Sequence, residues 1–357
     1  MSKKIFCVCF CTLFFLSCVF FAAGAFSGGE NAASEGRELS PFPSWVKDGA
    51  FNSAFFTEFD TWMTDRFSLR QELITANAWI RENLFATGSD QVIVGRDDFL
   101  FFADTAPDYT GESALSDADI AAAADALRTL SDYADARGAR LIVAVAPNKN
   151  TIYPDKMPAA YRRGDAPSNL DRLHEALDAR GVAYADLRGA LTDDGTLLYH
   201  KRDTHWNGMG ALRAYDAILT AAEIPHEDYA AYATITAADF PGDLDEMLYP
   251  AAALYDENTM PDFDFASQFI YTSNSLTSMD MTIATRGSGE GKALIFRDSF
   301  GSALIPYFSA AFAEVRYERA VPYRIDLLEQ YSADLVIVEI AERNIANLTA
   351  AADRLAE

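Results

Sequence analysis

The stretch that decides the fold is "ARLIVAVAP", residues 139–147. It is a nearly continuous apolar run that is rich in β-branched side chains. A run of this kind is typical of a strand that is covered on both faces, as in a parallel sheet with helices on either side. Two later stretches, "KALIF" (292–296) and "ADLVIVEIAE" (333–342), are predicted to be strands of the same sheet.

Helical patterns separate these strands. Ser116 and Asp117 resemble caps of a helix that runs to about residue 136. Further helices are predicted over 168–179, about 207–222 and 343–355, and further strands over 182–187 and 313–318. Strands that alternate with helices predict an α/β fold with a mostly parallel sheet and right-handed crossovers.

Two other regions lie outside this alternation. Residues 55–83 predict amphipathic helices, and residues 90–102 predict a strand, a turn at 95–98 and a second strand. Residues from about 223 to 290 contain no long periodic segment and are rich in acidic, Pro, Ser and Thr residues. We interpret this span as an irregular insertion that covers part of the site.

The N-terminus predicts export. Lys3 and Lys4 precede an apolar run that ends in Ala23-Gly24-Ala25, the pattern of a signal peptide over residues 1–25. The run is also about as long as a membrane-spanning helix, so an uncleaved anchor is the alternative. Residues 26–50 then predict a flexible tether, and residues 51–357 the exported domain.

Composition excludes several classes. All four cysteines lie within residues 7–18, so the exported domain has no disulfide and no thiolate nucleophile. The formal net charge is −24, which opposes binding to nucleic acid. No glycine-rich phosphate loop follows a strand, so we expect no nucleotide cofactor and no cofactor of another kind.

Three chemistry-bearing residues lie where strands and helices meet. Ser299 falls at the predicted strand-to-helix turn of "IFRDSFGSAL" (295–304), and Asp203 and His205 precede the helix of "RDTHWNGMGALRAY" (202–215). An imidazole can deprotonate a serine hydroxyl, and a carboxylate can orient and stabilise that imidazole. The alternative for Ser299 is a plain helix cap, because serine is common at that position.

Other residues near these loops are candidates for the oxyanion or for substrate. Asn148, Lys149 and Asn150 follow the strand of residues 139–147, and Arg297 precedes Ser299. The cations Lys149, Arg202 and Arg297 either make the pocket positive or pair with acidic neighbours.

Three more residues leave alternatives open. Tyr153 either contacts substrate or packs in the core, and Trp206 either holds its loop or forms a sugar platform. His200 either lies in a supporting position or joins Asp203 and His205 in a metal site; we expect no metal.

At these residues the chain resembles the SGNH hydrolase-like domain of the alginate O-acetylation proteins AlgJ and AlgX, and the related bacterial DHHW proteins. Four more stretches of that family's pattern follow one another in the same order: "DRFSLRQELI" (65–74), "VIVGRDDFLFF" (92–102), "APNKNTIYPDKMP" (146–158) and "VIVEIAERN" (336–344).

The resemblance implies an SGNH/flavodoxin-like three-layer α/β/α domain with Ser299 as nucleophile, His205 as base and Asp203 as its partner. It also implies transfer of an acetyl group to the hydroxyls of an exported polysaccharide, or hydrolysis of acetyl esters, with acyl groups supplied by a membrane acyltransferase. A non-catalytic component of polysaccharide export or binding is the third hypothesis. The chain departs from the family pattern at Thr204, where the DHHW motif has histidine, and at Arg297, where relatives often carry lysine.

Overall fold

The computed structural model describes residues 3–27, 40–47, 49–67, 69–85, 87–192, 195–252, 254–273, 281–319 and 321–355. Residues 28–39 and 48 of the predicted tether lie outside these ranges. The chain divides into two compact units, one of residues 1–93 and 241–254, and one of residues 94–240 and 255–357.

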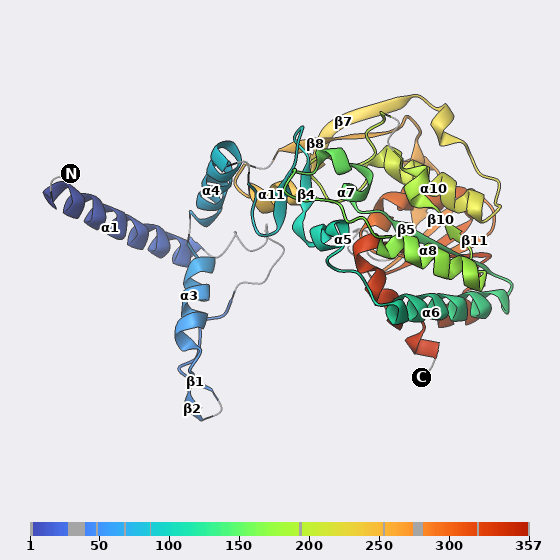
Figure 1. The fold of residues 1–357 in the computed structure, drawn as a ribbon, viewed down its shortest axis with the longest axis horizontal. Coiled ribbons are helices and arrows are strands. Elements are labelled where there is room, and N and C mark those ends of the chain that lie inside the picture. Colours follow the sequence, from blue (N-terminus) through green and yellow to red (C-terminus); the bar gives the residue numbers. More distant parts are fainter. Residues whose placement is uncertain are drawn as a thin grey trace. The chain divides into compact units, whose positions relative to one another are not determined.

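The second unit is built on a seven-stranded sheet with the order β6-β5-β13-β11-β12-β10-β9. Figure 1 labels β5, β10 and β11 of this sheet, together with the helices α6, α8 and α10 of the same unit. Its parallel part consists of β6 (Tyr184–Ala185), β5 (Arg140–Ala146), β13 (Leu335–Ala341), β11 (Lys292–Phe296) and β12 (Glu314–Glu318). Strands β10 (Thr282–Gly287) and β9 (Phe269–Tyr271) extend it in antiparallel fashion. The fold is therefore α/β with a mostly parallel sheet, as the sequence predicts.

Apolar side chains cover both faces of this sheet. Leu141, Val143 and Val145 of β5 face a core shared with α6 (Asp117–Asp135) and α8 (Asn169–Arg180). The alternate residue Ile142 is also fully buried, and so points to the opposite face. That side of the unit carries α10 (Gly208–Ala221) and α12 (Ile305–Ala311). Strands buried on both faces explain why β5 and β13 are apolar at all but one position each.

Local sequence sets where the helices begin. Ser116 and Ser168 each form a capping box with the acidic residue three positions later, Asp119 and Asp171. Asn207 caps α10 by accepting a hydrogen bond from the backbone N–H of Gly210. Helix α10 thus begins one residue after the segment that holds Asp203 and His205, which fixes that segment to a rigid element.

Shorter elements complete this unit. Its other helices are η1 (Ala103–Thr105), α5 (Ala106–Thr110), α7 (Lys149–Ile152), η2 (Pro154–Lys156), α9 (Leu187–Ala190), η3 (Tyr229–Ala231), η4 (Phe265–Ser267), η5 (Phe300–Leu304), η6 (Ile325–Glu329), η7 (Glu342–Ala350) and η8 (Asp353–Leu355). The predicted strand–turn–strand is the pair β3 (Val92–Val94), which spans the boundary between the two units in the sequence, and β4 (Leu100–Phe102); Asp97 and Asp98 in its turn have positive φ.

Three predicted elements differ in the structure. The C-terminal segment is not an α-helix but the 3₁₀ turns η7 and η8, because its buried residues Ile345, Leu348 and Ala351 recur every third position. Strand β6 is only two residues long, because the Asp186 side chain caps α9 and ends it. The span 223–290 contains β9, β10 and the paired strands β7 (Thr234–Pro241) and β8 (Tyr255–Pro261).

The first unit holds the predicted amphipathic helices as α3 (Phe55–Asp65) and α4 (Arg70–Phe85). It also contains α1 (Lys3–Ser27), the pair β1 (Val46–Lys47) and β2 (Ala50–Phe51), and α11 (Asp243–Leu248). Across the described ranges, no helix combines the length and apolar character needed to cross a membrane.

Candidate active site

Asp203 and His205 lie on a tight loop closed by its own backbone. Tyr199 and Trp206 form an antiparallel bridge, and the N–H of His200 donates to the carbonyl of His205 at 3.2 Å. Next to the bridge, the N–H of Asn207 donates to the carbonyl of Leu198 at 2.9 Å. We call residues 199–206 the His loop; its two ends are held together directly before α10.

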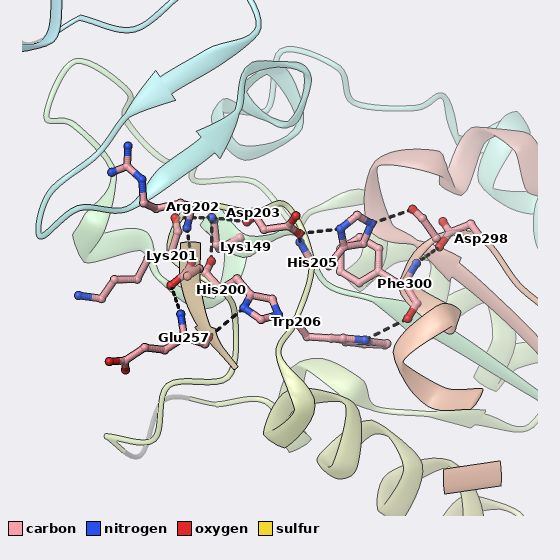
Figure 2. A network of polar contacts seen from close by, with 12 residues as sticks. Lys149, His200, Lys201, Arg202, Asp203, His205, Trp206, Glu257, Asp298 and Phe300 are labelled. Atoms are coloured by element: carbon pink, nitrogen blue, oxygen red, sulfur yellow. Dashed lines mark hydrogen bonds and ion pairs between the residues drawn. The ribbon is translucent and has the colours of Figure 1, made fainter. Parts of the chain in front are cut away.

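A buried lysine holds the His loop from inside. The Nζ of Lys149 donates to the carbonyl oxygens of His200 at 3.1 Å, Lys201 at 3.0 Å and Asp203 at 2.6 Å. Only 4% of Lys149 is exposed, so its ammonium is removed from bulk water and stabilised by these carbonyl dipoles. Figure 2 shows the lysine side chain among the backbone carbonyls of this loop.

Strand β8 supports the other side of the loop. The carboxylate of Asp256 accepts from the N–H of Arg202 at 2.7 Å, and the ring of His200 lies 3.1 Å from the carbonyl of Glu257. The segment that we expected to cover the site therefore contacts the His loop through β8.

Ser299 lies on a second turn, between β11 and η5. The carboxylate of Asp298 accepts from the N–H of Phe300 at 2.9 Å and from the N–H of Ala341 at 2.8 Å. The N–H of Asp298 donates in turn to Glu339 of β13 at 3.1 Å. We call residues 297–301 the Ser turn; the half-buried carboxylate of Asp298 and the buried carboxyl group of Glu339 hold its backbone.

The His loop and the Ser turn meet at the ring of His205. Its Nδ1 lies 2.7 Å from Oδ1 of Asp203, and its Nε2 lies 2.8 Å from Oγ of Ser299. The Nε1 of Trp206 donates to the carbonyl of Phe300 at 3.1 Å, which is a second link between the two segments. Figure 2 shows His205 between Asp203 and the turn that bears Asp298 and Phe300.

This geometry determines what the ring can do. Asp203 is 3% exposed and its Oδ1 also accepts the backbone N–H of His205 at 2.7 Å. With the Nδ1 proton directed at this carboxylate, Nε2 carries the lone pair that accepts the Ser299 hydroxyl proton. The side chain of His205 is 23% exposed and Ser299 is half-buried, so a substrate can approach the pair. The arrangement suits acyl transfer through serine.

The two asparagines predicted near the oxyanion are directed elsewhere. Asn148 is 1% exposed; its N–H donates to Glu342 at 2.7 Å and its Nδ2 donates to Asp108 at 3.2 Å. Asn150 is fully buried, and its Nδ2 donates to the carbonyl and the hydroxyl of Thr105. Both amides anchor α7 and its neighbours through these bonds.

The other predicted residues surround the site in different ways. Tyr153 is buried and its hydroxyl accepts the N–H of Leu198 at 2.9 Å. Arg297 is also buried, donates to the carbonyl of Asp298 and to Ser302 Oγ, and has a pKa that burial lowers. Arg202 contacts Asp256 through its backbone, and the buried indole of Trp206 braces the Ser turn.

Among the described residues, His200 does not belong to the group whose possible ligand atoms lie close to those of Asp203 and His205. Its ring stacks on Phe240 at a centroid distance of 3.8 Å, and burial lowers its pKa. A ring held in this way supports the wall of the loop.

Two glutamates were missed from sequence. Burial raises the pKa of Glu339 well above its usual range, with Asp298 as the next cause. Burial likewise raises the pKa of Glu342 to about 7, and Asp108 adds to the shift. The signal was available: Glu339 interrupts the apolar run "LVIVEIA" (335–341), where an acid has no surface to face.

Comparisons with known proteins support the fold. Residues 92–265 match the family described as the SGNH hydrolase-like domain of acetyltransferase AlgX. A probable alginate O-acetylase AlgJ from Pseudomonas syringae pv. tomato (strain ATCC BAA-871 / DC3000) is 26% identical over 183 residues. That match covers 49% of this chain and 44% of AlgJ, so the chain spans less than half the length of this relative.

Two solved structures share the fold. A DHHW family protein from Eubacterium siraeum DSM 15702 is 18% identical, with a TM-score of 0.51, and the match covers 65% of this chain and 88% of that chain. PatB1 from Bacillus cereus is also 18% identical, with a TM-score of 0.56, and the match covers 71% and 96% respectively.

Proposed function

We propose that this chain, whose residues 92–265 match the SGNH hydrolase-like domain family of acetyltransferase AlgX, is an exported serine O-acetyltransferase. Its acceptor is a hydroxyl group of a cell-surface or secreted polysaccharide, and the acetyl group passes through an ester on Ser299. The observation that carries the proposal is the ring of His205, which lies within hydrogen-bonding distance of both Asp203 and Ser299.

The first half-reaction forms the acyl-enzyme. Ser299 Oγ attacks the acetyl carbonyl carbon of the donor while His205 Nε2 takes its proton. The negative charge that develops on the carbonyl oxygen is stabilised by the backbone N–H of Ser299. When the bond to the donor's leaving group breaks, the imidazolium returns the proton to that group, and Asp203 stabilises the imidazolium throughout.

The second half-reaction reverses these roles. A sugar hydroxyl loses its proton to His205 and attacks the acetyl-serine carbonyl carbon. The bond to Oγ breaks, Ser299 recovers the proton from the imidazolium, and the acetylated sugar leaves. If water attacks in place of the sugar, the same residues make an acetyl esterase.

The N-terminal signal pattern supports an exported location, with residues 1–25 as either a cleaved peptide or a tether. An acyl donor on the outer side of the membrane is needed there, and we assign its supply to a membrane acyltransferase. The net charge of −24 repels nucleic acid, so we expect no nucleic-acid partner.

The test is covalent trapping with an activated acetyl ester or a sulfonyl fluoride, followed by mass mapping of the labelled peptide. We expect the label on Ser299, no label in Ser299→Ala, and labelling at least about 10³-fold slower in His205→Ala. Label elsewhere, or labelling of Ser299 at an unchanged rate in His205→Ala, would overturn the mechanism.

Acceptor dependence separates transferase from esterase. Incubation of the acetylated enzyme with neutral oligosaccharides should give acetylated sugar and should speed the loss of label from Ser299. Release of acetate at a rate that no sugar changes would identify the esterase. A folded Ser299→Ala variant that still supports polysaccharide acetylation would identify a non-catalytic component.

A further inference from the structure

A concave site lies on the same unit, away from Ser299. It is a groove of about 710 Å³, within the size range of small-molecule sites. Its walls come from the C-terminal part of α10, the segment 224–232, Phe263 and the end of α12. Glu290, which lines it, precedes β11, whereas Ser299 follows β11. A five-residue strand, about 17 Å long, therefore separates the two ends.

The lining of this groove combines aromatic rings with neutral or acidic polar groups. Tyr232 is 38% exposed, and its ring lies 5.2 Å from that of Phe263 and 6.1 Å from that of Tyr229. Glu227 accepts a hydrogen bond from the Tyr232 hydroxyl at 3.0 Å, which fixes the direction of that side chain. Gln268 adds a carboxamide. Apolar rings beside hydrogen-bonding groups suit a pyranose ring, which has C–H faces and an equator of hydroxyls.

A buried hydroxyl gives an independent indication of a polar ligand. Tyr215 lines the groove and is fully buried, and its hydroxyl has no hydrogen-bond partner among the described residues. The ring lies 5.8 Å from that of Tyr229 and 5.3 Å from that of His226, both of which also line the groove. A ligand hydroxyl that reached this group would satisfy a donor that is otherwise costly to bury.

Charge narrows the class of sugar. Among the described residues that line the groove, two are glutamates, Glu227 and Glu290, and none is lysine or arginine. The whole chain has a net charge of −24, so its long-range field also repels polyanions. A polymer of uronic acids would therefore be bound poorly here.

We propose that this groove binds a neutral hexopyranose segment of the acceptor polysaccharide, at a distance from the acetylation site. The proposal rests on the proposed function for the identity of the acceptor, but not for the binding itself. The groove lets a long chain be held at one end of the sheet while another part reaches Ser299. It also distinguishes this protein's acceptor from the alginate in the name of the AlgJ relative.

The test is equilibrium binding of linear hexasaccharides to the full protein by calorimetry, which needs no acyl transfer. A panel would include neutral glucose, mannose and galactose oligomers, an oligomannuronate as polyanion and a chitosan hexamer as polycation. We expect binding of at least one neutral oligomer and at least about tenfold weaker binding of the oligomannuronate at low ionic strength. No neutral binder, or tightest binding of either charged oligomer, would overturn the proposal.

Two variants place the binding in the groove. Tyr215→Phe removes only the unpartnered hydroxyl, so stability should be unchanged or higher, while the dissociation constant rises by about 3- to 10-fold. Tyr232→Ala removes the exposed ring and should raise it by about 2- to 10-fold. The matched control is Tyr271→Ala, which removes a 41% exposed tyrosine that does not line the groove. Equal binding by all three variants would show that the sugar binds elsewhere.

Unchanged binding in these variants would remove the groove from the proposal and leave the acyl-serine mechanism intact. Failure to label Ser299, with groove binding retained, would remove the mechanism and leave a sugar-binding protein. The two results are therefore distinguishable.

Discussion

The His loop and the Ser turn hold the three proposed catalytic residues, and the two segments are supported by side chains of opposite kinds: a lysine in one and carboxyl groups in the other. The His loop is organised by a cation, since Lys149 donates to three of its carbonyl oxygens. The Ser turn is organised by carboxyl groups, since Asp298 accepts from two backbone N–H groups and Glu339 accepts from a third. One segment is therefore fixed through its acceptors and the other through its donors.

This difference follows from which backbone groups each segment leaves without a partner. The His loop, whose two ends are joined by the Tyr199–Trp206 bridge, directs three carbonyl oxygens toward Lys149. A group with several donors, such as an ammonium, can satisfy all three. A turn at the end of a parallel strand exposes N–H groups, which a carboxylate can accept. Lys149 and Glu339 are buried and Asp298 is half-buried, so each segment is held from the protein side, and the His205–Ser299 distance depends on both supports.

The largest expected effect is that of Lys149→Met. Methionine has a similar length but no donor, so three buried carbonyls lose a charged partner, and we expect a loss of about 3–5 kcal/mol in the free energy of unfolding. Urea unfolding measures it, and labelling of Ser299 should slow at temperatures where the variant is folded. The control is Lys156→Met, which removes only surface ion pairs with Asp97 and Asp155. Equal effects of the two substitutions would show that the His loop does not depend on Lys149.

The second prediction concerns the pH dependence of stability on the side of Lys149. Glu342 accepts the N–H of Asn148 next to Lys149, and its pKa is raised from 4.5 to about 7. Because the folded state binds the proton more tightly than the unfolded state, the stabilisation is complete below pH 4.5. It is lost as pH rises to about 7, by roughly 3 kcal/mol in total.

Glu342→Gln should remove this part of the pH dependence. The variant and the wild type would be compared by urea unfolding at pH 5 and at pH 8, and the variant should gain relative to the wild type at the higher pH. Glu329→Gln, which alters a largely exposed acid, is the control. If the free energies of unfolding of wild type and Glu342→Gln differed by the same amount at both pH values, Glu342 would not be the group whose proton stabilises the folded state.

The sequence predicted the sheet and the meeting of the reactive residues better than it predicted their supports. Strands such as β5 and β13 are visible because both faces are buried, so nearly every side chain is apolar. The sequence does not predict strand β10, because "TIATRG" alternates buried with less buried residues and lies in the span interpreted as an irregular insertion. The 3₁₀ turns after β13 were taken for an α-helix, since spacings of three and four are hard to separate over a few residues.

The proposed roles of Ser299, His205 and Asp203 could be inferred because their side chains carry the chemistry. The role of Lys149 could not, because its partners are backbone carbonyls about 50 residues away, and backbone groups leave no mark in a sequence. For the same reason the sequence makes the neighbouring asparagines candidates for the oxyanion or for substrate, whereas Asn148 and Asn150 bond to Asp108, Glu342 and Thr105.

The third prediction tests the carboxyl side of the comparison. Asp298 uses one oxygen for Phe300 and the other for Ala341, so Asp298→Asn keeps one acceptor and turns an N–H donor toward the other amide. We expect a loss of about 1–3 kcal/mol in the free energy of unfolding and slower labelling of Ser299. Asp264→Asn, which alters an exposed cap of the short helix η4, is the control. If Asp298→Asn labelled Ser299 at the wild-type rate, the turn would not need both oxygens.

The smallest expected effect concerns Tyr153→Phe, which lies on the His-loop side. The Tyr153 hydroxyl accepts the N–H of Leu198, directly before the Tyr199–Trp206 bridge, and phenylalanine keeps the buried ring but leaves that N–H unsatisfied. A loss of about 1 kcal/mol in the free energy of unfolding is expected, well below that of Lys149→Met, because one neutral hydrogen bond is removed rather than three to a cation. Labelling of Ser299 should stay within a few-fold of wild type, since the three bonds from Lys149 still hold the loop. A loss of labelling as large as that of Lys149→Met would instead place the main support of the His loop at its closed end, and the contrast between a cation-held loop and a carboxyl-held turn would fail.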